Sequence, residues 1–116
     1  MKGQLAIPAL FAQPFDASRF EWQPFRPGVD ISPLYGGGPG APAAALLRYA
    51  PGASVPRHLH RGYEHILILS GSQRDDNGSY ELGTLLVSEP GTAHRVTSEQ
   101  GCVVLAIWER PVEMQE

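Results

Sequence analysis

The sequence predicts an all-β fold, a barrel or sandwich built from short antiparallel strands. Glycine (13 residues) and proline (11 residues) are scattered between short apolar runs along the 116-residue chain, which indicates many turns. The strand-like runs follow one another at intervals of roughly 8–12 residues, a spacing typical of sandwiches and barrels. No capped segment of about ten or more residues carries the period of an amphipathic helix.

The length of 116 residues fits one domain with one hydrophobic core. We expect a single domain over residues 1–116, in which residues 1–42 form an N-terminal arm with edge strands and residues 43–110 form the barrel. Within the arm, residues 20–25 alternate polar and aromatic side chains, and they predict an edge strand that ends at Pro24.

The barrel region contains several predicted strands, separated by turn residues. A loop with the sequence Gly-Gly-Gly-Pro-Gly at residues 36–40 precedes them. Further along, Asn77-Gly78 is the strongest hairpin signal in the chain. The predicted strands cover residues 43–49, 55–60, 64–70, 85–88, 94–97 and 102–108.

Two predicted strands, residues 65–69 and 103–108, are apolar on both faces instead of alternating. One face of each strand can line a barrel interior. The other face needs a cover as well, which either the N-terminal segment or a second chain can provide. Because closed two-fold dimers are the commonest assembly, we expect a homodimer.

Composition and charge argue against several classes of partner. The formal net charge is −3 and basic residues do not cluster, so nucleic-acid binding is not expected. No apolar run approaches the roughly 20 residues of a membrane span. Residues 5–12 are too short and contain Pro8, so we expect a cytoplasmic protein without a signal peptide. Cys102 is the single cysteine; it excludes an intramolecular disulfide and is expected to be a packing residue.

Three histidines and one glutamate form the sequence pattern that predicts a metal site. Residues two apart on a strand point to the same face, so His58 and His60 project together. Glu64 keeps this parity after the Arg61-Gly62 turn, and His94 opens a later strand. If that strand lies across the barrel, the four donors converge. Imidazole nitrogens with one carboxylate oxygen suit a divalent transition metal, namely Fe, Mn, Ni, Cu or Zn.

The glycines around these residues complete a pattern that resembles the two sequence motifs of the cupin family. The second motif shows two departures, because its proline comes one residue late, as Pro90, and its final asparagine is replaced by Ser98. The resemblance implies a cupin barrel, also called a double-stranded β-helix or jelly roll, with the same three histidines and glutamate as metal ligands. The matching residues are Gly52, His58, His60, Glu64 and Gly71 for the first motif, and Gly83, Gly91 and His94 for the second.

A narrower resemblance, over residues 45–108, is to the ChrR-like cupins, which resemble the C-terminal domain of a zinc-dependent anti-sigma factor. The residues that carry it include Leu47-Arg48-Tyr49-Ala50-Pro51-Gly52, Asp76-x-Gly78-x-Tyr80-x-x-Gly83 and Gly101-Cys102. Anti-sigma factors of this type carry a further helical domain with a His/Cys zinc site. The sequence contains no histidine before His58, so we do not expect that sigma-binding domain here.

The resemblance leaves two classes of function open. One is a metal-dependent enzyme, dioxygenase-like, acting on a small anionic or dicarbonyl compound. The other is a metal-containing sensor or binding module without a sigma-binding domain. The residues themselves do not separate the two classes, nor do they identify the metal.

Two further side chains are candidates for the substrate pocket. Arg48 has the parity of apolar Leu46, so it can hold an anionic ligand if that face is the interior; the alternative is an arginine at the rim that pairs with an acid. Tyr63, in the turn between the ligands, can close over the pocket or merely pack. His65 has the opposite parity to Glu64 and is expected to face outward.

Overall fold

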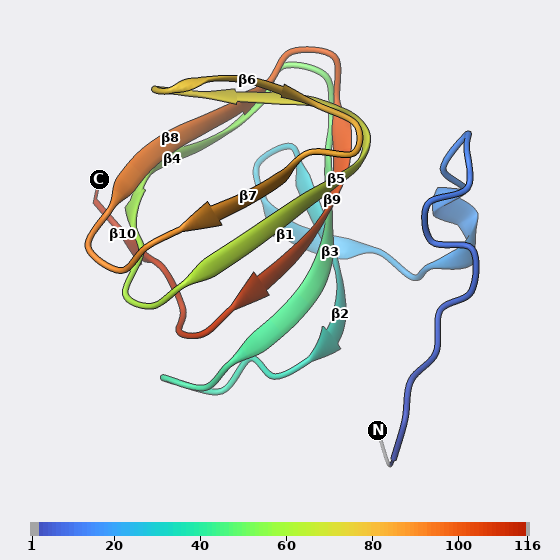
Figure 1. Ribbon diagram of the computed structural model, residues 1–116, viewed down its shortest axis with the longest axis horizontal. Helices are drawn as coiled ribbons and strands as arrows, with labels where there is room; N and C mark the ends of the chain where they lie inside the picture. Colours follow the sequence, from blue (N-terminus) through green and yellow to red (C-terminus); the bar gives the residue numbers. More distant parts are fainter. Residues whose placement is uncertain (1–2, 116) are drawn as a thin grey trace.

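The computed structural model describes residues 3–115, and within them it confirms the predicted all-β class. A single 3₁₀ turn, η1 (Ala17–Arg19), precedes the strands, and the chain otherwise alternates between strands and turns (Figure 1). The strands are β1 (Gln23–Arg26), β2 (Val29–Tyr35), β3 (Ala43–Tyr49), β4 (Ala53–Leu59), β5 (Glu64–Asp75), β6 (Gly78–Glu81), β7 (Leu85–Ser88), β8 (Ala93–Ser98), β9 (Cys102–Trp108) and β10 (Glu113–Met114).

The strands form two antiparallel walls that face each other. One wall has the order β1-β2-β3-β9-β5-β7, and the other contains β10, β4, β8 and β6. Strand β5 belongs to both, because its first half pairs with β7 and β9 and its second half with β6 and β8. The result is a barrel, in which β5 and β9 run along one side and β4 and β8 along the other (Figure 1).

All six strands predicted for the barrel region are present. Residues 43–49, 85–88 and 102–108 are strands with the predicted bounds. Strand β5 is longer than predicted, because the hairpin after it continues the pairing to Asp75 opposite Gly78. The two turn residues are therefore Asp76 and Asn77, one position earlier than the Asn77-Gly78 signal.

Sequence reasoning missed β2, β6 and β10. Strand β2 contains Pro33, which argues against a strand, and its pairing with β3 is irregular between Pro33 and Tyr35. Strands β6 and β10 are short and mostly polar, so they carry no alternating pattern of their own. Each is formed through pairing with a neighbour, β6 with β5 and β10 with β4.

The apolar strands have a core on each face. Inside the barrel, a cluster that includes Leu47, Ile68 and Val104 fills the space between the walls. On the outside, Leu46, Leu69 and Val103 form a second cluster. The arm before β1 covers this second cluster through Leu10, Phe15, Phe20 and Trp22. The N-terminal segment is thus one of the two covers that the sequence predicted.

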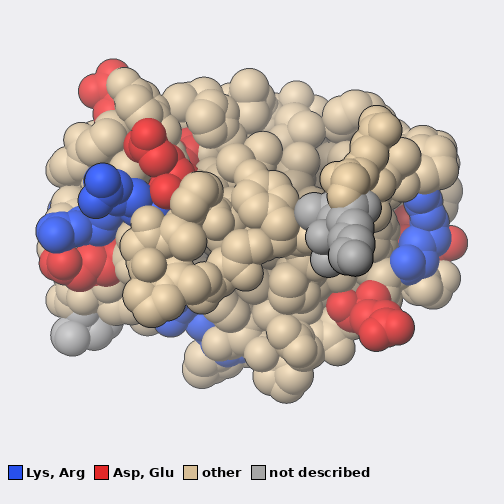
Figure 2. Space-filling model, turned by 90° about the horizontal axis from the view of Figure 1, so that it is seen from below, with Lys and Arg blue, Asp and Glu red and all other residues tan. Residues whose placement is uncertain are grey.

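The surface shows no concentration of basic charge on the face drawn in Figure 2. Arginine side chains lie beside acidic side chains toward the left and right ends of this face, and further arginine atoms are visible at its lower edge. Residues 3–115 contain no helix that is long and apolar enough to span a membrane.

Candidate metal centre

The four predicted ligands come from three neighbouring segments of the barrel. His58 in β4 lies directly opposite His94 in β8, and His60 follows the end of β4. Glu64 is the first residue of β5. All four side chains are buried, and their potential ligand atoms lie within 4.8 Å of one another. The structure therefore brings together the group that the sequence pattern predicted.

Pairing between β4 and β8 explains why the histidines converge. His58 and His94 are cross-strand partners, and their ring centroids are 4.7 Å apart. The backbone of His60 continues the ladder, since its N–H donates to the Thr92 carbonyl and its carbonyl accepts from the Gly91 N–H, both at 2.8 Å. The glycine turn before β8 thus places His60 beside His94, with ring centroids 4.7 Å apart.

The Nδ1 atom of each histidine has a hydrogen-bond partner outside the cluster. His58 Nδ1 lies 2.9 Å from the Pro56 carbonyl oxygen, and His94 Nδ1 lies 3.0 Å from Asp75 Oδ2. A carbonyl and a carboxylate can only accept, so both nitrogens carry the proton. The Nε2 atoms of these two rings are then free to act as ligands.

The same tautomer follows for His60. Its Nδ1 lies 3.0 Å from Thr92 Oγ1, and that hydroxyl donates its own hydrogen to the Glu89 carbonyl at 2.6 Å. The hydroxyl oxygen must therefore accept from His60 Nδ1–H. The Nδ1 contacts of all three imidazoles thus leave their Nε2 atoms as the potential ligand atoms of the cluster.

This arrangement fits a bound cation. His60 Nε2 lies 3.1 Å from Glu64 Oε1, so two potential ligand atoms face each other. Among the described residues, His94 Nε2 is the buried side-chain atom that has no hydrogen-bond partner. A buried acceptor without a partner is costly, and a divalent ion would satisfy it together with its neighbours.

The electrostatics keep Glu64 and His58 in the protonation states that metal binding requires. Burial by itself raises the pKa of Glu64, yet its contacts with His60, His58 and Trp108 leave that pKa below its usual value. Burial lowers the pKa of His58, although the Pro56 carbonyl opposes the shift. Glu64 is thus ionised and His58 neutral near pH 7, as metal coordination requires.

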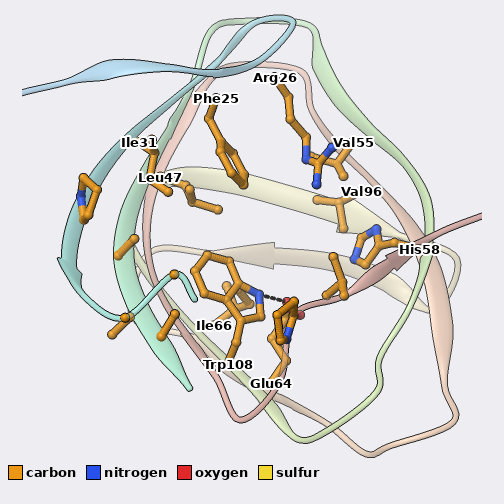
Figure 3. A pocket seen from close by; sticks show the side chains of 18 of the residues that line it. Phe25, Arg26, Ile31, Leu47, Val55, His58, Glu64, Ile66, Val96 and Trp108 are labelled. Carbon is orange, nitrogen blue, oxygen red and sulfur yellow. Dashed lines mark hydrogen bonds between the residues drawn. The ribbon is translucent and has the colours of Figure 1, made fainter. Parts of the chain in front are cut away.

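Two residues that sequence reasoning missed hold the ligands in place. Trp108 Nε1 donates to Glu64 Oε2 at 2.7 Å, which leaves the other oxygen facing His60 (Figure 3). Asp75 accepts from His94, from the Asn77 N–H and from the Tyr80 hydroxyl. Burial raises the pKa of Asp75, but these hydrogen bonds outweigh it and leave the pKa below its usual value. A second negative charge therefore lies behind the cluster.

An apolar cavity of about 340 Å³ lies between the two walls and reaches His58, Glu64 and His94. In Figure 3, His58 and Glu64 point into it. This volume lies at the lower end of the range for small-molecule pockets, roughly 300–1,000 Å³. Its apolar walls include Ile31, Leu47, Val55, Ile66, Leu86 and Val96.

The structure does not place the other two candidates in this cavity. Strand β3 turns Leu47 inward, so Arg48 lies on the outer face, where it pairs with Asp30 at 3.0 Å and lies over the Trp22 ring. The alternative of an arginine paired with an acid is the arrangement observed. Tyr63 is 47% exposed and is not among the cavity residues. Cys102, in contrast, is buried in the core as predicted.

The barrel, the glycine turns and the converged His and Glu side chains define a protein of the cupin class. The model of the ChrR cupin-like domain matches residues 13–112, and the chain belongs to this family.

The relatives agree with this assignment. The chain is 33% identical to the anti-sigma-E factor ChrR of Cereibacter sphaeroides over 94 residues, which are 78% of this chain and 43% of that protein. It thus spans less than half the length of this curated relative.

Solved structures are similar as well. The ChrR chain in the Rhodobacter sphaeroides complex with SigE has a TM-score of 0.71 and 29% identity, covering 80% of this chain and 51% of that one. A putative acetylacetone dioxygenase from Methylibium petroleiphilum has a TM-score of 0.77 over 100% of this chain and 85% of its own, at 12% identity, which shows a shared fold alone.

Proposed function

We propose that this protein is a metal-dependent enzyme, dioxygenase-like, that acts on a small anionic or dicarbonyl compound. The observation that carries the proposal is the cavity of about 340 Å³, which reaches three of the four presumed ligands. A metal with a purely structural role is normally closed off by protein ligands, whereas a catalytic metal keeps open positions that face a pocket. The direct contact between cluster and cavity favours the second kind of site.

Each residue of the cluster has a definable role in this proposal. His58, His60 and His94 offer Nε2 atoms, and Glu64 offers Oε1, to one divalent transition metal. Such an ion supplies Lewis acidity and open coordination positions. Trp108 orients the carboxylate, and the apolar walls of the cavity keep water away from the bound compound.

The charge of the site favours an anionic ligand. Three neutral imidazoles and one carboxylate leave a divalent ion with a net charge of about +1 in an apolar cavity, where charges interact strongly. Asp75 lies one imidazole further away and reduces this excess without removing it. A singly charged anion or an enolisable dicarbonyl compound is therefore the expected partner.

Metal analysis and oxygen consumption test this proposal. Wild-type protein, loaded in turn with Fe, Mn, Ni, Cu and Zn and then desalted, is expected to retain close to one ion per chain. The double variant His58→Ala/His60→Ala is expected to lose it. His65→Ala is the matched control, because His65 lies beside Glu64 on β5 but outside the cluster. Wild-type protein that retains none of the metals contradicts the proposal.

A sensor or binding module is the second candidate, and the 33% identity to the anti-sigma-E factor ChrR favours it. The two functions predict different metals and reactions. Native zinc at full occupancy, with no oxygen uptake in the presence of 1,3-diketones or small keto acids, favours the sensor. Iron, manganese, copper or nickel with oxygen uptake favours the enzyme.

A further inference from the structure

The cavity contains one basic side chain that nothing so far explains. Of the described residues that line it, Arg26 is the only Lys or Arg, and Glu64 is the only Asp or Glu. In the view of Figure 3, Arg26 enters from the side of β1, across the cavity from Glu64 and Trp108. A guanidinium group in an otherwise apolar wall is costly unless an anion pairs with it.

Arg26 has no acidic partner within the described part of the chain. Four other arginines form ion pairs with Asp or Glu side chains: Arg48, Arg57, Arg61 and Arg74. The guanidinium of Arg26 lies instead over the Phe25 ring, whose centroid is 4.9 Å from the guanidinium carbon. Its donors are thus available to a ligand.

The local backbone turns Arg26 inward. Neighbouring residues on a regular strand point to opposite faces, yet Phe25 and Arg26 both line the cavity. The cause is a bulge, since Pro24 lies opposite Asp30 and Arg26 lies opposite Val29, which leaves Phe25 as the extra residue. Bulges of this kind re-aim side chains and are frequent beside functional sites.

Burial along β1 is also the reverse of the ordinary preference. Phe25 is 42% exposed, whereas Arg26 is the one residue of β1 that is half-buried. Aromatic residues are normally the buried ones and arginines the exposed ones. In addition, burial raises the pKa of Tyr49, which lines the same cavity, and the charge of Arg26 partly offsets this rise.

We propose that Arg26 binds the carboxylate of a small organic acid within the cavity, and that the acid carries this carboxylate on an apolar body. The inference rests on the proposed function in taking the cavity as the ligand site. The planar fork of a guanidinium suits a carboxylate because two parallel hydrogen bonds form. A compound held in this way can direct its other end toward His58, Glu64 and His94.

The test compares hexanoate with 1-hexanol on protein freed of metal by a chelator, so that the carboxylate has no ion to bind. Isothermal titration calorimetry measures both affinities. Wild-type protein is expected to prefer hexanoate by about tenfold or more, the usual contribution of charged hydrogen bonds. Arg26→Gln is expected to lose most of this preference, and Arg26→Lys, which keeps the charge but not the fork, part of it.

Arg48→Gln is the matched control, since that arginine lies on the outer face and should leave the preference unchanged. Thermal unfolding of each variant verifies that it is folded, and Arg26→Lys supplies the comparison if Arg26→Gln is not. Equal binding of the two probes by the wild type, no binding of hexanoate, or a preference retained in both Arg26 variants overturns the inference.

The zinc content of the same proteins, measured after reloading, separates this result from the proposed function. Arg26→Gln is expected to retain zinc as the wild type does. Wild-type protein that binds hexanoate through Arg26 but retains no metal would contradict the metal proposal alone. Wild-type protein that retains zinc without any preference for hexanoate would contradict the role of Arg26 alone.

Discussion

Two carboxylates act on the His58, His60, Glu64 and His94 cluster in different ways. Glu64 belongs to the cluster itself, and Trp108 fixes the rotation of its carboxylate. Asp75 acts through His94, whose Nδ1 proton it accepts, and so it determines both the tautomer and the orientation of that ring. Groups of this second kind raise the basicity of a ligand, and their loss typically costs about 10–100-fold in metal affinity.

The first prediction at this scale concerns Asp75. Asp75→Asn removes the negative charge but keeps a similar shape, so we expect zinc affinity to fall about tenfold to hundredfold. Competition with a chromophoric chelator measures it. Asp76→Asn is the matched control, because Asp76 is an exposed neighbour that pairs with Arg57 at 3.6 Å. Equal losses in both variants would mean that charge near the turn, and not the contact with His94, is responsible.

The residues that could be predicted from sequence are those whose position follows from strand parity and motif spacing. His58 and His60 share a face because they are two apart, and the spacing to Glu64 and His94 matches a recognisable pattern. Trp108 and Asp75 could not be found in this way. Trp108 reaches Glu64 because β9 pairs with β5 in a register that sets the two residues opposite each other. Such long-range pairing leaves no local signal.

The same distinction holds at the scale of the elements. Strands β3, β7 and β9 were predicted with their observed bounds, since apolar runs and turn residues delimit them. Strand β2 was missed because Pro33 interrupts its pattern. Arg26 was missed because its inward direction depends on the bulge in β1, and the sequence carries no local signal for that bulge. Irregular strands thus account for the least predictable part of the pocket.

Gly71 in β5 lies where the backbones of β5 and the start of β9 approach each other closely. Gly71 lies opposite Cys102, with a φ of 74°. A Cβ atom there would lie 2.1 Å from the Gly101 carbonyl oxygen, which is backbone and has little room to move. A side chain is therefore disfavoured both by the left-handed conformation and by the close approach of β9.

We predict that Gly71→Ala lowers the free energy of unfolding by about 3 kcal/mol or more. Gly40→Ala is the control, because Gly40 has a similar φ of 68° but nothing within 4 Å of the added Cβ atom. That variant should cost only about 1–2 kcal/mol, the penalty of the left-handed conformation. Urea unfolding of both variants measures the difference. Similar losses would show that conformation, and not the contact with Gly101, makes glycine necessary at position 71.

In the whole molecule, the arm before β1 covers only part of the outer surface of the strands that are apolar on both faces. It covers Leu46, Leu69 and Val103, but the outer face near β7 stays open. Val87 lies opposite His65, which in turn lies opposite Ile107, so these residues form a row across three strands. Val87 is 53% exposed and Ile107 is 37% exposed. Leu85, in the same strand as Val87, is 56% exposed.

The homodimer expected from the sequence stays a prediction, and we propose that the open face of one chain packs against that of a second. An isologous contact of this kind places each residue near its own copy, so a charge introduced in the row is repeated across the interface. We expect wild-type protein to be a dimer at micromolar concentration by light scattering, and Val87→Lys to be monomeric. Leu5→Lys is the control, because Leu5 is 51% exposed and lies beside β2, at the other end of the wall from β7. A monomeric wild type contradicts the dimer. If Val87→Lys remains dimeric, the dimer interface lies elsewhere on the molecule, and it does not explain why this apolar row is exposed.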